Sequence, residues 1–338
     1  MSRIRFLFAS AALIVVATAF VACGGGGNSD ADPQSVIDDA TLQGIESADV
    51  DATLRVKASG KKGGNLEVSL RGPFESIEGG SMPKLDLTAK ANGRLNGKDV
   101  DFEGGLVLLP NSAYVGYQGS EYEVDPTTFS FAEATLKEAL RQGGGEEESE
   151  GTSACQDAAS ELEVGDFVDN LSNEGDADVA GTTTTKISGE LDVAGGIESL
   201  LKLYEGSACS SLLSAIGSLP SSAELRSARE EVEKSVKTAH VDVYVGDDDI
   251  VRRVVAELAV EPTKQESGPS HAEVNLELTL AGVNEDQEIV APTKTKPLSA
   301  LFQKLGVNPL ELLGALQGEG NGLENLFEEI GAESTQGL

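Results

Sequence analysis

The side chains best suited to chemistry in this chain of 338 residues are three cysteines and two histidines. Cysteine thiolates can attack a substrate, bind a soft metal, form a disulfide or carry a modification, and histidines can move protons or bind metals. Neither histidine lies near a cysteine in the sequence, which gives no support to a thiol nucleophile activated by an imidazole. So few ligands also leave little for a His/Cys metal site. We therefore predict neither a metal nor a cofactor.

The chain lacks the short motifs that mark hydrolases, zinc peptidases and phosphate-binding loops. His240 falls on the polar side of a predicted strand and His271 begins another, so both are expected at the surface. Asp176-Ala177-Asp178 is similar to the start of a calcium-binding loop, but Ile187 stands where an EF-hand needs glutamate. The acidic segment 246–249 is predicted to be a simple turn rather than a weak cation site. We predict that the protein is not an enzyme.

The first cysteine, Cys23, ends an N-terminal segment with the features of a secretion signal. A basic start is followed by the apolar residues 6–20, which are too few for a membrane span of about 20 residues. Val21-Ala22-Cys23 and the glycines after it resemble a bacterial lipoprotein signal. This resemblance implies cleavage before Cys23 and a diacylglycerol on its thiol; an ordinary cleaved signal followed by an unmodified cysteine is the other interpretation. We predict a signal peptide over 1–22 and a lipidated, flexible tether over 23–33.

Lipidation of Cys23 leaves an even number of cysteines, Cys155 and Cys209. Outside the cytoplasm, two remaining thiols form a disulfide more often than a catalytic pair. We therefore predict a Cys155–Cys209 disulfide, which would stabilise the fold by roughly 2–4 kcal/mol.

Most of the chain alternates apolar and polar residues with a period of two, which is typical of strands with one apolar and one solvated face. Short turns, expected for example at Asn92-Gly93 and Asn96-Gly97, leave no room for crossover helices. We predict an α+β fold in which about nine or ten antiparallel strands form one curled half-barrel sheet, with helices covering its apolar concave face. The alternation covers residues 50–58, 66–70, 85–91, 100–108, 113–117, 182–193, 239–245, 250–260 and 272–280.

Helical patterns precede, interrupt and follow these strands. Asp32 as N-cap and Pro33 at the first position open a helix that is expected to continue to about Glu46. The other expected helices cover about 131–140, 155–173, 197–204 and 222–238. The predicted organisation is a half-barrel domain over 34–296, with an acidic loop over 143–151 and a helical segment over 205–238, and an amphipathic helical C-terminal tail over 297–338.

The apolar side of the sheet is the candidate binding site. It is lined by short aliphatic side chains that could contact flexible acyl chains, but a core filled by helices has the same pattern, so a ligand cavity and a filled core both stay open. The predicted lining residues are Leu54, Val56, Val68, Leu70, Leu85, Leu87, Phe102, Leu106, Ile187, Leu191, Val241, Val243, Val254, Leu258, Val274, Leu276 and Leu278.

Several segments occur in an order that is found together in one family. They are the lipid-modified Cys23, the strand 122–125 before a Pro-initiated helix, the segment 179–189, the strands 241–247 and 250–253, and the closing segment 283–292. In this order the chain resembles the actinobacterial LppX/LprG-type lipoproteins, which are similar in fold to the periplasmic lipoprotein carrier and the outer-membrane lipoprotein receptor. The resemblance covers about residues 34–296. It implies a half-barrel sheet closed by helices over a hydrophobic cavity and, as in several members, an acylated lipid or a lipoglycan as ligand.

The net charge of −32 excludes some partners and limits others. A strongly acidic chain gains nothing from phosphate contacts, so we predict no nucleic-acid binding. Removal of 1–22 takes away Arg3 and Arg5 and changes the charge to −34, which anionic lipid headgroups repel.

We therefore expect a lipoprotein that is anchored through Cys23 on the extracytoplasmic face of the cell membrane. There it would bind or transport a lipid or another apolar molecule. The alternative is an envelope scaffold with a filled core and no ligand, which meets a protein partner through its acidic outer face or its C-terminal tail 297–338.

Overall fold

The computed structural model describes residues 31–60, 63–76, 83–95, 97–131, 133–134, 168–193, 195, 226, 229, 234–261 and 269–306. Several predictions fall outside these residues: the signal peptide, the lipid site at Cys23, the Cys155–Cys209 disulfide, the acidic loop 143–151 and most of the helical segment 205–238. They stay predictions, as does the structure of the tail beyond Gly306.

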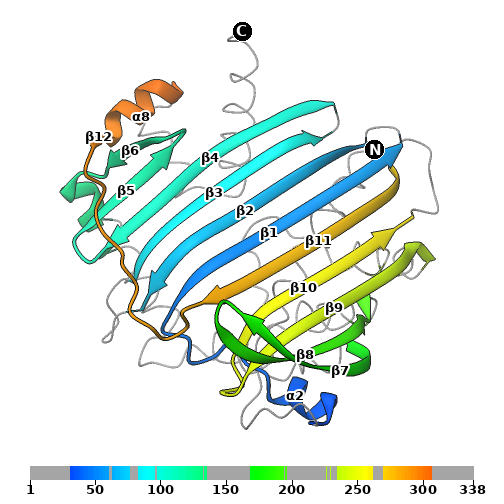
Figure 1. The fold of residues 1–338 in the computed structure, drawn as a ribbon. Coiled ribbons are helices and arrows are strands. Elements are labelled where there is room, and N and C mark those ends of the chain that lie inside the picture. Colours follow the sequence, from blue (N-terminus) through cyan, green and yellow to red (C-terminus); the bar gives the residue numbers. More distant parts are fainter. Residues whose placement is uncertain are drawn as a thin grey trace.

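The described strands form one twelve-stranded sheet that is curled but not closed into a barrel (Figure 1). Their order across the sheet is β12-β6-β5-β4-β3-β2-β1-β11-β10-β9-β8-β7. The bounds are β1 Ser47–Gly60, β2 Gly64–Glu75, β3 Lys84–Leu95, β4 Lys98–Leu109, β5 Ser112–Tyr117, β6 Ser120–Glu123, β7 Val168–Val179, β8 Thr182–Leu191, β9 Val236–Gly246, β10 Val251–Val260, β11 Pro269–Ala281 and β12 Thr295–Pro297.

Strand β1 joins the two halves of the sheet. It pairs with β2 on one side and with β11 on the other, so that Leu54 lies opposite both Val68 and Leu276. Every pairing in the sheet is antiparallel except that of β12 with β6, which is parallel. The sheet is therefore mixed. The prediction of a purely antiparallel sheet was wrong at this edge, because β12 is added after the chain has run from the end of β11 to the other side of the sheet (Figure 1).

The helix predicted over 155–173 overlaps a strand, β7, that the sequence pattern did not predict. Val168 and Leu171 have helical spacing and both pack on one core cluster. The chain nevertheless pairs with β8 as a strand. Its register shifts between Asp169 and Ser172 and again between Asn173 and Gly175, and Asn170 has a positive φ of 54°. These shifts break the period of two, which is why the residues look helical in the sequence.

Three other boundaries differ from the predictions. The first helix, α2 (Pro33–Asp39), begins at the predicted Asp32 cap but ends well before Glu46, because Thr41 forms a bridge with Ile250. Asn92-Gly93 lies inside β3 and is not a turn. The charged helix expected up to residue 238 has ended where β9 begins at Val236.

The described helices α2 and α8 (Leu298–Leu305) lie at opposite ends of the sheet (Figure 1). α2 contributes Ile37, which is 1% exposed, to a core cluster with Ile187 and Val243. At the β3–β5 end, Phe129 from the short helical stretch after Asp125 packs on Leu108. Both ends of the apolar face are thus covered, whereas coverage of its middle by helices stays a prediction.

Candidate functional site

The pairing register brings all seventeen predicted lining residues to one face of the sheet, because residues directly opposite each other in paired strands point to the same side. One row across the sheet runs Val241, Ala256, Leu276, Leu54, Val68, Ala91 and Phe102. The neighbouring row runs Ile187, Val243, Val254, Leu278, Ala52, Leu70, Ala89 and Gly104.

Burial along this face changes from one half of the sheet to the other. On β8, β9 and β11 the side chains of Ile187, Val241, Val243 and Val274 are buried. On β2 and β4 three large apolar side chains are exposed: Leu70 by 39%, Phe102 by 42% and Leu106 by 41%. The other predicted lining residues are half-buried: Leu54, Val56, Val68, Leu85, Leu87, Leu191, Val254, Leu258, Leu276 and Leu278.

Leu70, Phe102 and Leu106 form what we call the β2–β4 patch. Leu70 lies opposite Ala89, and Ala89 lies opposite Gly104, which separates Phe102 from Leu106 along β4. A Cβ at Gly104 would lie 2.7 Å from the tip of the Phe102 ring, so this ring leans over the glycine. Since Ala89 and Gly104 carry little or no side chain, the larger apolar groups around them stay accessible.

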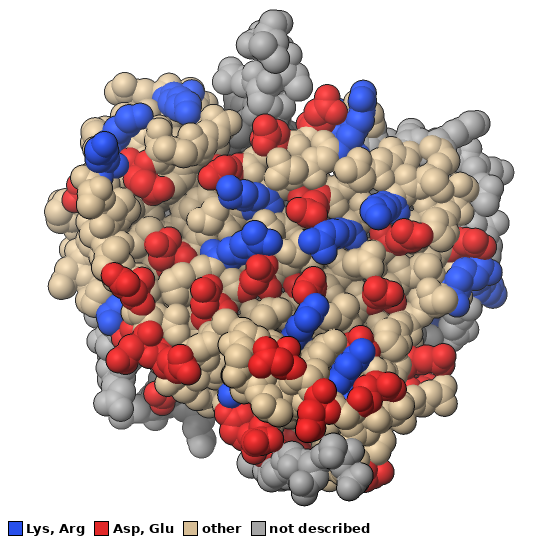
Figure 2. All heavy atoms as spheres, in the orientation of Figure 1, with Lys and Arg blue, Asp and Glu red and all other residues tan. Residues whose placement is uncertain are grey.

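The opposite face of the sheet is polar and carries charges of both signs (Figure 2). Acidic and basic side chains alternate across strands β8 to β2, and Tyr244 lies between the cations Lys186 and Arg253 at 5.8 and 5.3 Å from its ring centroid. This ladder of ion pairs indicates that the polar face is the solvent face. Its N–O distances are 3.0 Å for Lys186–Asp242, 2.7 Å for Arg253–Glu277, 3.9 Å for Arg55–Glu277 and 2.8 Å for Arg55–Glu67.

Asp242 accepts a hydrogen bond from Ser188 Oγ at 2.6 Å and lies 3.0 Å from Lys186 Nζ. Burial raises its pKa, but hydrogen bonds from Ser188 and Lys186 and the charge of Lys186 outweigh burial, so that the pKa of Asp242 lies below its usual value. The hydrogen bond to Asp242 in turn raises the pKa of Lys186. The pair is therefore ionised over the whole physiological range.

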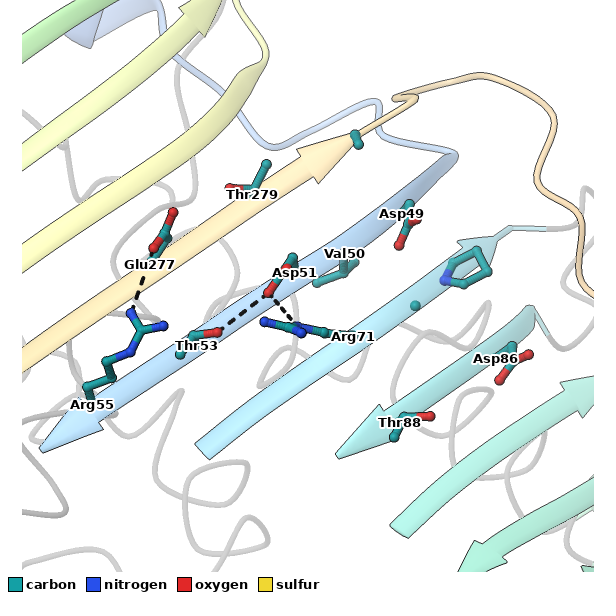
Figure 3. Close-up of a pocket in the computed structure, with 13 residues that line it drawn as sticks. Asp49, Val50, Asp51, Thr53, Arg55, Arg71, Asp86, Thr88, Glu277 and Thr279 are labelled. Atoms are coloured by element: carbon teal, nitrogen blue, oxygen red, sulfur yellow. Dashed lines mark hydrogen bonds and ion pairs between the residues drawn. The ribbon is translucent and has the colours of Figure 1, made fainter. Parts of the chain in front are cut away.

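The polar face also contains a hollow of about 820 Å³ over β11, β1, β2 and β3 (Figure 3). Gly72 and Pro73 are among its lining residues. A side chain at Gly72 would overlap the carbonyl oxygen of Asp86. Arg71 is paired with Asp51 at 3.0 Å inside it. Burial raises the pKa of Asp86, another of its lining residues. Such a charged lining does not suit an apolar ligand. The hollow was not predicted, because the alternation in the sequence indicates only that this face is solvated.

The two histidines lie at the surface, as predicted. His240 Nε2 is 3.0 Å from Asp242 Oδ1 and His271 Nε2 is 3.2 Å from Glu273 Oε1, each on an exposed strand position. Among the described residues, no group of three or more His, Cys, Asp or Glu side chains is arranged to hold a metal. No helix within the described ranges is long and apolar enough to cross a membrane.

No protein family model and no curated protein matches the chain. Among solved structures it is similar to LprF from Mycobacterium bovis, with 14% identity and a TM-score of 0.35 over 80% of this chain and all of LprF. It is also similar to the lipoprotein LppX from Mycobacterium tuberculosis, with 14% identity and a TM-score of 0.27 over 73% of this chain and 91% of LppX. Lipovitellin matches at 8% identity and a TM-score of 0.27, over 76% of this chain and 27% of lipovitellin.

LppX is also one of the two proteins for which the lipoprotein family that the sequence resembles is named. With identities and TM-scores this low, the likeness carries no weight for what the chain binds. That has to come from the chain's own geometry.

Proposed function

We propose that the protein is a lipoprotein of the cell envelope that binds or transports a lipid or another apolar molecule on the apolar face of its sheet. The observation that carries this proposal is the β2–β4 patch. It continues an aliphatic layer that is buried on β8 and β9, yet its own three large side chains are about two-fifths exposed. Contiguous apolar groups left accessible on an otherwise charged protein mark a binding surface.

The free energy gained by burying methylenes limits which ligands can bind. Each buried methylene contributes roughly 0.8 kcal/mol, so an acyl chain with about ten buried methylenes gains roughly 8 kcal/mol. Association costs about 4–15 kcal/mol in lost freedom of movement and ordering. For short acyl chains the free energy of burial therefore roughly equals the cost of association. This face favours a ligand with long or paired acyl chains. No covalent step and no cofactor is part of the proposal, and we propose no enzymatic activity.

The ligand would lie between the sheet and the helices that we predict over its concave face. Ile37 and Phe129 already pack on the two ends of the apolar layer. We therefore propose that acyl chains bind over β1 to β4, next to the patch.

The net charge of the chain indicates how it is held at the membrane. At −34 after processing, the chain is repelled by anionic headgroups. We therefore propose that the lipid on Cys23 holds it at the extracytoplasmic face of the cell membrane. Replacing Cys23 by Ser should move the protein from the membrane fraction to the soluble fraction.

A scaffold with a filled core is the second candidate, and one observation favours it. Around Ile187 and Val243 the apolar face is already a packed core with α2, so no ligand is needed there. If the middle of the face is filled in the same way, the function lies on the acidic outer face or on the C-terminal tail.

Ligand extraction and probe binding separate the two functions. Purified protein is extracted and analysed by mass spectrometry, and the stripped protein is then titrated with 1-N-phenylnaphthylamine, a neutral apolar fluorophore. We expect a co-purifying acylated molecule and saturable probe binding that Leu106→Glu weakens. Val290→Glu is the matched control, since Val290 is an apolar residue that is 61% exposed between β11 and β12 in the sequence and does not belong to the patch. Absence of both ligand and saturable binding would overturn the proposal in favour of the scaffold.

A further inference from the structure

The C-terminal end of the described chain lies next to the β2–β4 patch. Helix α8 packs against β6 and β12 through Leu301, which is 5% exposed. From its last turn, Lys304 Nζ lies 5.0 Å from the centroid of the Tyr117 ring. The Tyr117 ring is in turn 6.4 Å from the ring of Phe102. One aromatic side chain therefore separates the end of α8 from the patch.

The chain continues beyond Gly306 with a segment whose sequence matches this surface. Gly306 ends α8 in the left-handed conformation, with a φ of 68°. In the segment 307–338, apolar residues recur at the spacing of a helix face: Leu310, Leu313 and then Leu323, Leu326, Phe327 and Ile330. An amphipathic helix of this kind needs an apolar surface to cover its own.

Charge favours the same placement. The segment 307–338 contains six Glu and no Lys or Arg. Two lysines border the apolar face beside the patch, since Lys304 lies over Tyr117 and Lys296 lies 5.7 Å from the centroid of Tyr122. Their side-chain hydrogen bonds go to neutral groups, those of Gln118 and Ser120. Within the described part of the chain, neither lysine has a carboxylate in ion-pair range.

We infer that residues 307–338 dock on the β2–β4 patch of the same chain, with their leucine face on Leu70, Phe102 and Leu106 and their glutamates toward Lys296 and Lys304. This inference rests on the proposed function in one respect: if the patch binds the apolar ligand, the docked segment and the ligand exclude each other.

An occupant from the same chain is favoured over a second copy for two reasons. The segment starts beside the patch, so its effective concentration there is of millimolar order, as for other short linkers. A second copy would bring another 34 net negative charges against a chain that already carries 34 after processing, and like charges of that size oppose association.

The absence of tryptophan from the chain makes the docking measurable. We would use the processed chain from residue 23 with Cys23→Ser, and place one tryptophan in the tail with Phe327→Trp. Acrylamide quenching of this tryptophan should be several-fold weaker than in the isolated peptide 307–338 with the same substitution. Adding Leu106→Glu should raise quenching to the level of the peptide, whereas the control Val290→Glu should leave it unchanged. Circular dichroism and the melting temperature verify that both variants fold.

Equal quenching in chain and peptide, or quenching that Leu106→Glu does not change, would overturn the docking. Protection that appears only at high protein concentration would also overturn it, in favour of a second copy.

Competition between the tail and a ligand is tested from the tail, where substitutions leave the sheet untouched. The variant Leu323→Asp/Leu326→Asp should bind 1-N-phenylnaphthylamine several-fold more tightly than the parent chain. In the chain that carries Phe327→Trp alone, saturating probe should restore quenching of the tail tryptophan. If the tail tryptophan is protected but no probe binds to either chain, the proposed lipid-binding function fails and the docking stands. If the probe binds equally to both chains, the tail does not dock on the ligand's surface and the proposed function stands.

Discussion

The two halves of the apolar face should respond differently to the same truncation. Ile187, on β8, is 1% exposed and packs in the cluster that contains Ile37 and Val243. Leu106, on β4, belongs to the same face but is 41% exposed. We predict that Ile187→Ala mainly destabilises the fold and that Leu106→Ala mainly weakens ligand binding.

The expected magnitudes follow from burial. Truncation of a buried isoleucine to alanine costs about 2–5 kcal/mol, and the nearly complete burial of Ile187 favours the upper half of that range. Full burial of a leucine contributes about 1.5–3 kcal/mol. Leu106 is 41% exposed, so it has roughly three-fifths of that burial, and its truncation at the surface leaves no closed cavity. The truncation should therefore cost about 1 kcal/mol. With a urea slope of about 2–3 kcal/mol per molar, Ile187→Ala lowers the unfolding midpoint by more than about 1 M and Leu106→Ala by less than about 0.5 M.

Ligand affinity should show the reverse order. Leu106→Ala removes three carbons from the surface that the acyl chain would contact, which corresponds to a loss of about 1–2 kcal/mol, or roughly five- to thirty-fold in Kd. Because the tail would lose the same contact, the titration is done in a chain that already carries Leu326→Asp. Urea unfolding followed by circular dichroism gives the stability, and 1-N-phenylnaphthylamine fluorescence gives the affinity. Equal destabilisation by both truncations, with unchanged affinity in both, would refute the division of the face into a core half and a binding half.

Three further predictions concern charges and thiols. Because burial raises the pKa of Asp86 in the folded chain, its ionisation opposes folding, so Asp86→Asn should raise Tm at about pH 7 and the gain should vanish as pH falls below the unfolded-state pKa. The pKa of Asp242 is lowered in the folded chain instead. Its ionisation therefore stabilises the fold at pH values above the unfolded-state pKa, and this stabilisation is lost as pH falls through the folded-state pKa. Tm measured against pH should fall more steeply in acid for the parent than for Asp242→Asn. Cys155 and Cys209 should both resist alkylation until a reductant is added, and mass spectrometry that finds both alkylated in the unreduced protein would rule out the disulfide.

The period-two alternation predicted most of the sheet because it reports directly which face of a strand is buried. It located β1 to β5 and β8 to β11 without any knowledge of their partners, whereas the strand at 122–125, which overlaps β6, was expected from the family resemblance. It could not predict that β1 pairs with β11, since Leu54 and Leu276 meet across more than two hundred residues and no local pattern encodes that contact. β12 has three residues including a proline and exists only through its pairing with β6.

The sequence predicted which residues lie on the apolar face but not which of them are buried. Alternation places Ile187 and Leu106 equally on the apolar face. Whether each is buried depends on what packs over it, and Ile37 and Phe129 cover only the ends. That information comes from tertiary packing, and so does the hollow on the polar face, which side chains from β11, β1, β2 and β3 line together.

An open sheet has two surfaces on which other chains can add, its edges and its faces, and here the edges are protected. Edge strand β7 exposes Asp169, Glu174, Asp176 and Asp178, and charges on an edge oppose pairing with another strand. The other edge, β12, is only three residues long and ends in Pro297, which has no N–H to donate. The polar face is solvated by its ion-pair ladder. On the middle of the apolar face, several large apolar side chains on β2 and β4 are exposed together, so burial of this face by a ligand or by the tail would lower the free energy.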